Sequence, residues 1–299
     1  MATKLLSNKR RYYVEQRKPQ FVKGLPLRVN VGVQQRYQKD LDRLMSQIIA
    51  ETEKTVRNIF KSEASKEFFA QDESIASIAR INLNKLSRRI AELLNKKAKA
   101  MAERMVNNTS KASASSLHQS LKEMSGGLSI KTSITSGVVA ESFKASVAAN
   151  VDLIKTIPDV YLNNVKGAVS RSIQNGGGLQ TLIPEIEKLL SNEAKKIKNK
   201  AKNVALDQTR KAYNSLNAAR MSSIGIDEFE WIHSGGGQRP REYHKENWPA
   251  GLNHGIFSLK NLPIVNKKTG ARGLPGNQPN CKCTMRPIIK FNEGEPVDG

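Results

Sequence analysis

Hydrophobic residues recur at steps of three and four through the first third of the chain, in two runs. Since an α-helix turns once in 3.6 residues, this spacing places the apolar side chains of a run on one face. The pattern predicts two long amphipathic helices over residues 37–106, each burying one stripe. The apolar members of the runs are Tyr37, Leu41, Leu44, Met45, Ile48, Ile49, Val56, Ile59, Phe60, Ile75, Ile78, Ile81, Leu86, Ile90, Leu93, Leu94, Met101 and Met105.

The pattern then weakens and returns. Residues 107–136 are rich in Ser, Thr, Asn and Gly, which predicts a linker. Helical spacing resumes over residues 137–225, where Pro158 separates two segments and Pro184 is expected in the first turn of a further helix. The N-terminal two-thirds of the chain are therefore expected to be mainly helical.

The C-terminal part has a different pattern. Residues 228–232 alternate between polar and apolar, and residues 284–289 suit a last strand. Between them lies a segment rich in Gly and Pro. We expect a mainly α protein with a small C-terminal α+β module over residues 226–290, followed by a tail over 291–299.

Composition adds a strong charge to this picture. The 299 residues carry a formal net charge of +22, with a pI near 10.0 and 5% aromatic residues. Such an excess of positive charge favours an acidic partner, and double-stranded DNA leads because its phosphates can be neutralised by Lys and Arg. The two cysteines do not suggest a disulfide framework, and no apolar run is long enough for a membrane anchor, so we expect synthesis in a reducing cytoplasm.

Basic residues group in three places that are candidates for nucleic-acid contact. They are a basic arm over residues 1–36, a lysine-rich helical segment and two arginines of the C-terminal module. Alternatively, the arm is a solvated tail. The candidates are Arg10, Arg11, Arg17, Lys18, Lys195, Lys196, Lys198, Lys200, Lys202, Arg239 and Arg241.

The C-terminal segment also contains a candidate metal site. Cys281 and Cys283 are one residue apart, and His244 and His254 precede them. Thiolate and imidazole are the ligands that zinc prefers, and a metal would stabilise a module with little core. The spacing of the upstream histidines is not diagnostic, and His233 is an alternative fourth ligand. The alternative is a pair of buried thiols packed beside a hydrogen-bonded histidine.

A catalytic interpretation of the same segment is a Cys–His nucleophile pair, or a phosphate held by Arg239, Arg241 and His244. The segment lacks a carboxylate cluster and a group to orient the histidine. The sequence therefore favours a binding role over catalysis.

Four blocks of the sequence carry a recognisable pattern when taken in order. The first is residues 150–158, with Tyr161 and Leu162 after it, and the second is residues 208–214. The third begins at Trp231 and continues through Arg239, Arg241 and His244. The last contains Gly255 and Phe257 and then residues 279–283. Together the blocks cover about half of the chain, and they resemble the minor head or head-morphogenesis proteins of tailed bacteriophages, the phage Mu F-like family.

The chain departs from the family pattern in two places. Gly236 and Gly237 replace an acidic residue, which weakens any acid-dependent chemistry, and the loop over residues 259–278 is long and basic. Some family members have Cys-x-x-Cys where this chain has Arg241-x-x-His244, which implies a zinc site that is only partly kept or is completed differently.

The resemblance implies an internal virion component, present in several copies near the portal vertex. Its expected partners are the portal or major capsid protein and the packaged DNA, and its expected role is in head assembly, genome packaging or DNA delivery. Two alternatives remain: a metal-dependent nuclease or toxin-like enzyme in the C-terminal module, and a cellular nucleic-acid-binding protein.

Overall fold

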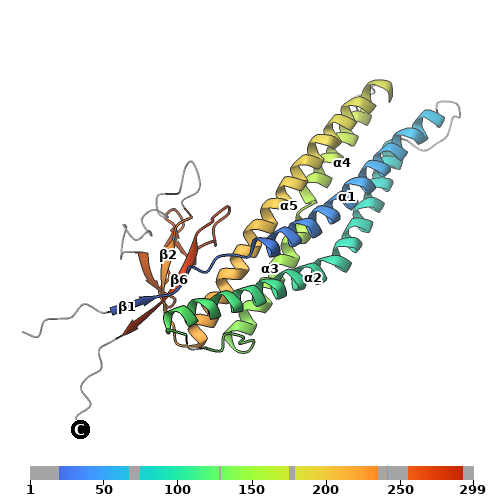
Figure 1. Cartoon of the computed structure of the whole chain (residues 1–299). Coiled ribbons are helices and arrows are strands. Elements are labelled where there is room, and N and C mark those ends of the chain that lie inside the picture. The colour runs from blue at the N-terminus through green and yellow to red at the C-terminus, as the bar shows by residue number, and fades with distance from the viewer. Residues whose placement is uncertain are drawn as a thin grey trace, which may run out of the picture.

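The computed structural model describes residues 20–66, 75–127, 129–174, 179–234, 241 and 255–291. Most of them are helical, and the strands after the helices form a small sheet module, as the sequence predicts, which a strand over residues 20–23 also joins. In Figure 1 the helices form an elongated bundle, and the sheet lies at one end of it. None of the described helices is both long and apolar enough to cross a membrane.

Two long helices, α1 (Val31–Lys66) and α2 (Ile75–Met124), form one side of the bundle. The hydrophobic stripe predicted for α1 is buried, with Leu41, Met45 and Ile48 fully inside the core. The first half of α2 contributes Leu86 and Ile90 to the same core. The residues that the helical spacing places on one face are therefore the ones that pack in the core.

The predicted linker over residues 107–136 is wrong for its first part, because α2 continues to Met124. Three of the Ser and Thr side chains that suggested a linker are buried instead: Thr109, Ser113 and Ser120. They form hydrogen bonds inside the protein, for example from the Ser120 hydroxyl to the carbonyl oxygen of Leu25 at 3.0 Å. A polar helix face is stable here because each of these side chains has a partner.

Three further helices complete the bundle: α3 (Val138–Thr156), α4 (Asp159–Gln174) and α5 (Leu179–Ser223). Pro158 separates α3 from α4, as predicted, whereas Pro184 lies inside α5 and not in its first turn. The helix α5 contacts each of the other four helices and is the central element of the bundle.

The sheet module contains four antiparallel strands in the order β1-β6-β2-β3: β1 (Gln20–Lys23), β2 (Glu228–Ile232), β3 (Ile256–Ser258) and β6 (Thr284–Phe291). Strands β2 and β6 are the two predicted from the sequence. A two-stranded ribbon of β4 (Ile264–Asn266) and β5 (Ala271–Arg272) lies in the loop between β3 and β6.

A second hydrophobic core joins the sheet to the bundle. Phe229, Trp231 and Met285 from the sheet pack with Leu117 of α2 and Tyr213 of α5. All five side chains are at most 1% exposed. The module is therefore attached to the ends of α2 and α5 by apolar packing.

The basic arm predicted over residues 1–36 is part of the fold from residue 20 onward. Strand β1 pairs with β6, where Val22 lies opposite Ile289, and α1 begins at Val31. The buried carboxylate of Glu230 accepts a hydrogen bond from Lys23 Nζ at 3.0 Å and lies 3.2 Å from Arg286 Nη1. This ion-paired cluster holds β1 to the middle of the sheet.

Candidate functional site

Both cysteines lie in the turn that leads into β6. Cys281 and Cys283 are each 4% exposed and form no disulfide. The turn contains Asn280, whose φ of 59° is in the left-handed region that asparagine tolerates. The thiols are therefore buried at the boundary between the sheet and the bundle.

The cysteine turn is fixed to α5 by polar contacts. Asp207 Oδ1 accepts a hydrogen bond from the backbone N–H of Asn280 at 2.8 Å, and Arg210 Nη1 donates to the carbonyl oxygen of Cys281 at 3.4 Å. Burial raises the pKa of Asp207 and lowers the pKa of Arg210. The docking of this turn depends on residues of the second family-like block and its neighbours.

Gly276 permits the close approach of this loop to α5. Its φ is +81°, and a Cβ atom on it would lie 2.7 Å from Nδ2 of the buried Asn214. A side chain there would be strained by the backbone conformation and would collide with the helix. The position therefore requires glycine for packing, not for chemistry.

The thiol of Cys283 has a raised pKa, first because of its hydrogen bond with Cys281 and then because of burial. A thiol with a raised pKa is protonated at neutral pH and is a poor nucleophile. This environment does not favour the nucleophile pair that was one interpretation of the sequence.

Two adjacent thiols match half of a tetrahedral zinc site. The histidines predicted to complete it, His244 and His254, lie outside the described residues, and His233 directly follows β2. Across the parts of the chain that the structure describes, no three His, Cys, Asp or Glu side chains are grouped closely enough to hold a metal. The two cysteine sulfur atoms are suitable zinc ligands, and the full set of four ligands stays a prediction.

The basic residues predicted to contact nucleic acid do not form one group in the structure. Arg241 donates from Nη2 to the carbonyl oxygen of Pro279 at 2.9 Å, so it supports the cysteine turn. The other arginine of that segment and the N-terminal candidates fall outside the described residues: Arg239, Arg10, Arg11, Arg17 and Lys18.

The lysines of α5 divide into two groups. Lys196 pairs with the buried carboxylate of Glu193 at 2.6 Å, and this contact, with that of Asn164, lowers the pKa of Glu193. Lys200 Nζ donates to the carbonyl oxygens of Thr156 and Ile157 at the end of α3. The remaining predicted lysines, Lys195, Lys198 and Lys202, are exposed on another side of α5.

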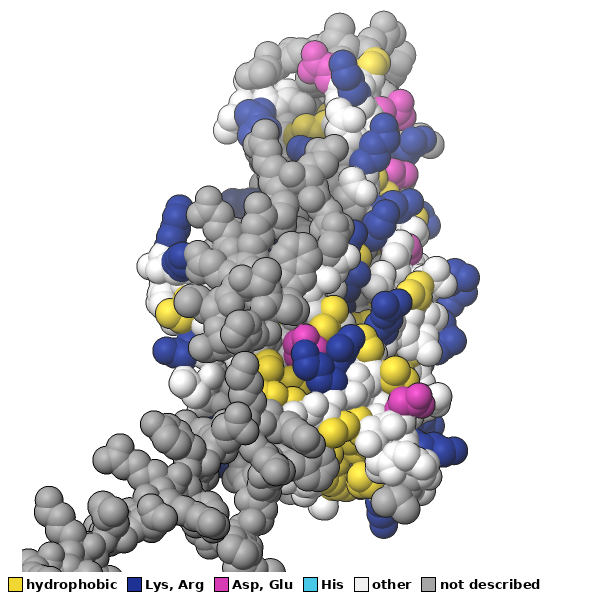
Figure 2. Space-filling model, turned by 60° about the vertical axis from the view of Figure 1, so that its left-hand side comes forward, with side chains coloured by type: hydrophobic (Ala, Val, Ile, Leu, Met, Phe, Trp, Pro, Cys, Tyr) yellow, Lys and Arg dark blue, Asp and Glu magenta, His cyan; other side chains and the backbone are white. Residues whose placement is uncertain are grey.

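Figure 2 shows the charge on one face of the molecule. Lys and Arg side chains are spread over its described part, with few Asp and Glu side chains between them. The positive charge predicted from composition is thus carried on the outside of the bundle, where it can meet an anionic partner.

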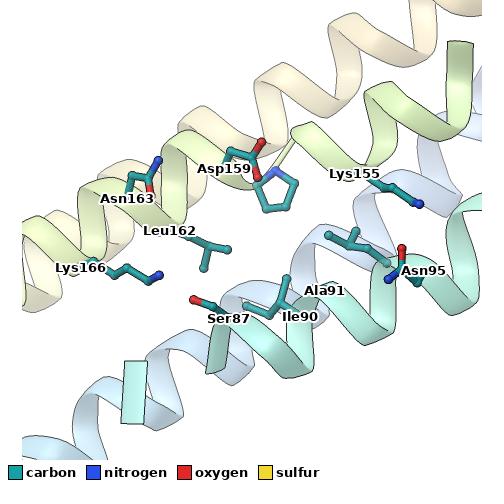
Figure 3. Close-up of a pocket in the computed structure, with 11 residues that line it drawn as sticks. Ser87, Ile90, Ala91, Asn95, Lys155, Asp159, Leu162, Asn163 and Lys166 are labelled. Carbon is teal, nitrogen blue, oxygen red and sulfur yellow. The ribbon is translucent and has the colours of Figure 1, made fainter. Parts of the chain in front are cut away.

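A hollow of about 380 Å³ between α2 and α4 was not predicted from the sequence. Figure 3 shows Lys155 beside Asn95 at one end, Lys166 near Ser87 at the other, and Leu162 between them. Its lining mixes apolar and polar side chains of α2 and α4 with Lys155 of α3 and Pro158, which meet only in the fold. Local spacing in the sequence contains no signal for such a surface.

Comparison with known proteins finds a family similarity in the C-terminal half of the chain. The family model described as phage Mu protein F like protein matches residues 163–286, which include most of α4, all of α5, strands β2 to β5 and the start of β6. The match confirms the resemblance to a family of phage head proteins. The first of the four resembling blocks, residues 150–158, precedes the matched region, and the other three lie within it.

One curated relative is an uncharacterized protein of Haemophilus influenzae (strain ATCC 51907 / DSM 11121 / KW20 / Rd). It is 30% identical to this chain over 155 residues, which are 52% of this chain and 31% of the relative. The chain therefore spans about a third of the length of that relative. No solved structure gives a significant match.

Proposed function

We propose that the protein is a minor head protein inside the phage capsid, where it binds the portal or capsid protein and DNA. The match of residues 163–286 to a phage head family carries this proposal. In this view several copies lie near the portal vertex and act in head assembly, genome packaging or DNA delivery. Assembly would take place in the host cytoplasm.

The charge distribution supports the DNA part of the proposal. The net charge of +22 would repel itself in a compact particle unless an anion neutralised it, and packaged DNA provides that anion. The elongated bundle offers basic side chains along its outside (Figure 2). A cellular nucleic-acid-binding protein would have the same charge but no reason to carry a phage head region.

We propose a structural role and not catalysis for the cysteine turn. Its contacts with Asp207 and Arg210 hold the sheet module against α5, and Arg241 supports the turn from within the module. If zinc binds, Cys281 and Cys283 would supply two ligands and His244 and His254 the others, and the metal would stabilise the same junction.

The proposal is tested by fractionating phage particles. Purified virions and DNA-free head precursors are separated by density and probed for the protein with an antibody. We expect it in both, at a few copies per particle. Its absence from virions and from head precursors alike would contradict the proposal, and release of intact protein only with the host cytosol would favour the cellular alternative.

A further inference from the structure

One side of α5 is a continuous polar surface with four lysines, which we call the α5 lysine stripe: Lys188, Lys195, Lys198 and Lys202. Three of them are seven residues apart, which is close to two helical turns, so they project in nearly the same direction. At 1.5 Å of rise per residue the stripe is about 21 Å long. All four side chains are exposed.

The stripe is not neutralised by the protein itself. Among the described residues none of the four lysines forms an ion pair or hydrogen bond. Acidic residues border the stripe at Glu185 and Glu187, and Glu187 pairs with Arg57 at 3.3 Å. The four charges are therefore available to an external partner.

The other exposed residues on this face of α5 are small and polar. Hydroxyl and amide groups are common partners of phosphate and sugar oxygens in protein–DNA complexes. No aromatic, arginine or large apolar side chain lies on this face. Its remaining exposed members are Ser191, Asn192, Asn199 and Asn203.

Two neighbouring lysines of α5, unlike those of the stripe, have partners within the protein. Lys196 and Lys200 are also exposed, but they lie on the opposite flank of α5, where their ammonium groups contact Glu193 and the end of α3. The lysine-rich segment predicted as one basic unit is therefore divided into two lysines that have partners within the protein and a stripe of lysines that have none among the described residues.

We propose that the α5 lysine stripe binds the sugar-phosphate backbone of duplex DNA without reading its sequence. This proposal rests on the proposed function and specifies the surface and the form of the nucleic acid. A protein partner is disfavoured because interface centres are rich in aromatic residues and Arg and poor in Lys. Single strands are disfavoured because their binding depends on aromatic side chains on which bases stack.

The dimensions suit a duplex. B-DNA carries about one charge per 1.7 Å of axis, so about 21 Å of duplex presents about twelve phosphates to four lysines. A rigid helix holds the lysines in a fixed line. The phosphates of a duplex also lie along a stiff axis and match this line, whereas a flexible single strand gains less from it. The expected contact is electrostatic and strongly dependent on salt.

The test uses the full chain and a fluorescently labelled 30-base-pair duplex of arbitrary sequence. Binding is measured by anisotropy over a series of NaCl concentrations. The stripe variant K188Q/K195Q/K198Q/K202Q is compared with a control that removes four exposed lysines from α1 and α2, K54Q/K85Q/K96Q/K111Q. Both variants change the net charge equally, and glutamine preserves helix propensity.

We expect the slope of log K against log salt to fall by about 3.6 in the stripe variant, at about 0.9 per lost phosphate contact, and by less than about 1 in the control. An equal change of the salt slope in the two variants would contradict binding at the stripe and would indicate an effect of net charge alone. Binding of a 30-nucleotide single strand as tightly as the duplex would overturn the preference for duplex. Duplex binding by the wild type with an unchanged slope in the stripe variant refutes this inference alone, whereas absence from phage heads refutes the proposed function.

Discussion

Arg220 of α5 donates a hydrogen bond from Nη1 to the hydroxyl oxygen of Ser113 on α2 at 2.7 Å, and both side chains are buried. The same guanidinium donates from Nη2 to Ser110 Oγ at 2.7 Å and from Nε to the carbonyl oxygen of Thr132 at 3.1 Å. No carboxylate pairs with it among the described residues. The buried charge is balanced by neutral acceptors from two other segments.

Replacing Arg220 with methionine is therefore expected to lower the free energy of unfolding by about 2 kcal/mol, because hydrogen bonds to a charged donor are lost inside the protein. Urea unfolding measures the change. Arg80→Met, at an exposed position of α2, is the control and is expected to change stability by less than about 0.5 kcal/mol. An Arg220→Met protein as stable as the wild type would mean that the cost of burying the charge equals the benefit of its hydrogen bonds.

Lys200 and Lys198 form a matched pair two residues apart on α5. Lys200→Met removes donors to two carbonyl oxygens at the end of α3 and is expected to reduce stability by about 0.5 to 1 kcal/mol. Lys198→Met is expected to leave stability unchanged, because its side chain is exposed and has no partner in the described structure.

The same pair should show the reverse order in DNA binding. Lys198→Met is expected to reduce the salt slope by about 0.9, while Lys200→Met leaves it unchanged. Thermal unfolding and anisotropy titrations on both variants provide the two measurements. A weaker DNA complex for Lys200→Met than for Lys198→Met would contradict the division of the lysines.

Ionisation of the Tyr161 hydroxyl is expected to lower the free energy of unfolding at alkaline pH. Burial raises the pKa of Tyr161 to about 12, whereas its ordinary value is 10.0. The unfolded chain loses this proton from about pH 10 upward, while the folded protein keeps it until about pH 12. Each pH unit in that window therefore lowers the free energy of unfolding by about 1.4 kcal/mol.

The measurement compares urea unfolding of the wild type and Tyr161→Phe at pH 9, 10 and 11. Below pH 10 the two should depend on pH in the same way, and above it the wild type should lose stability more steeply. The lysines cancel in this comparison because both proteins contain them. Parallel curves up to pH 11 would show that the hydroxyl ionises equally in both states.

The zinc prediction is checked by elemental analysis of the pure full-length protein. We expect about one zinc per chain, lost in Cys281→Ser and in His244→Ala, with a lower melting temperature after chelation. The exposed Lys111→Ser serves as a control that should retain the metal. A metal-free wild type whose melting temperature is unaffected by chelators would reject the site and leave a pair of buried thiols.

The long helices were predictable because their signal is local. The positions of Leu41, Met45 and Ile48 follow from helical spacing alone, and each is buried where that spacing requires. The second half of α2 was not predictable in this way. Its Ser and Thr residues are stable in a helix because they form hydrogen bonds with partners such as Arg220 and Leu25. These partners are about a hundred residues away in the sequence, so local spacing does not reveal them.

The candidate site was predictable to a similar degree. The charge and the adjacent cysteines pointed to the two relevant regions, but composition does not distinguish Lys200 from Lys198, because the difference depends on which helix lies beside each side chain. Strand β1 was missed for the same reason. Four residues such as Phe21 and Val22 become a strand through pairing with β6, and their own sequence contains little evidence for it.

The pairing of β1 with β6 also sets an order of events during synthesis. Thr284 and Leu27, which are hydrogen-bonded across this part of the sheet, are separated by 257 residues. The helices between them can form and pack as they leave the ribosome, whereas β1 must wait until β6 has emerged. The sheet module is therefore expected to close last, with the chain around Phe21 exposed to other proteins until then.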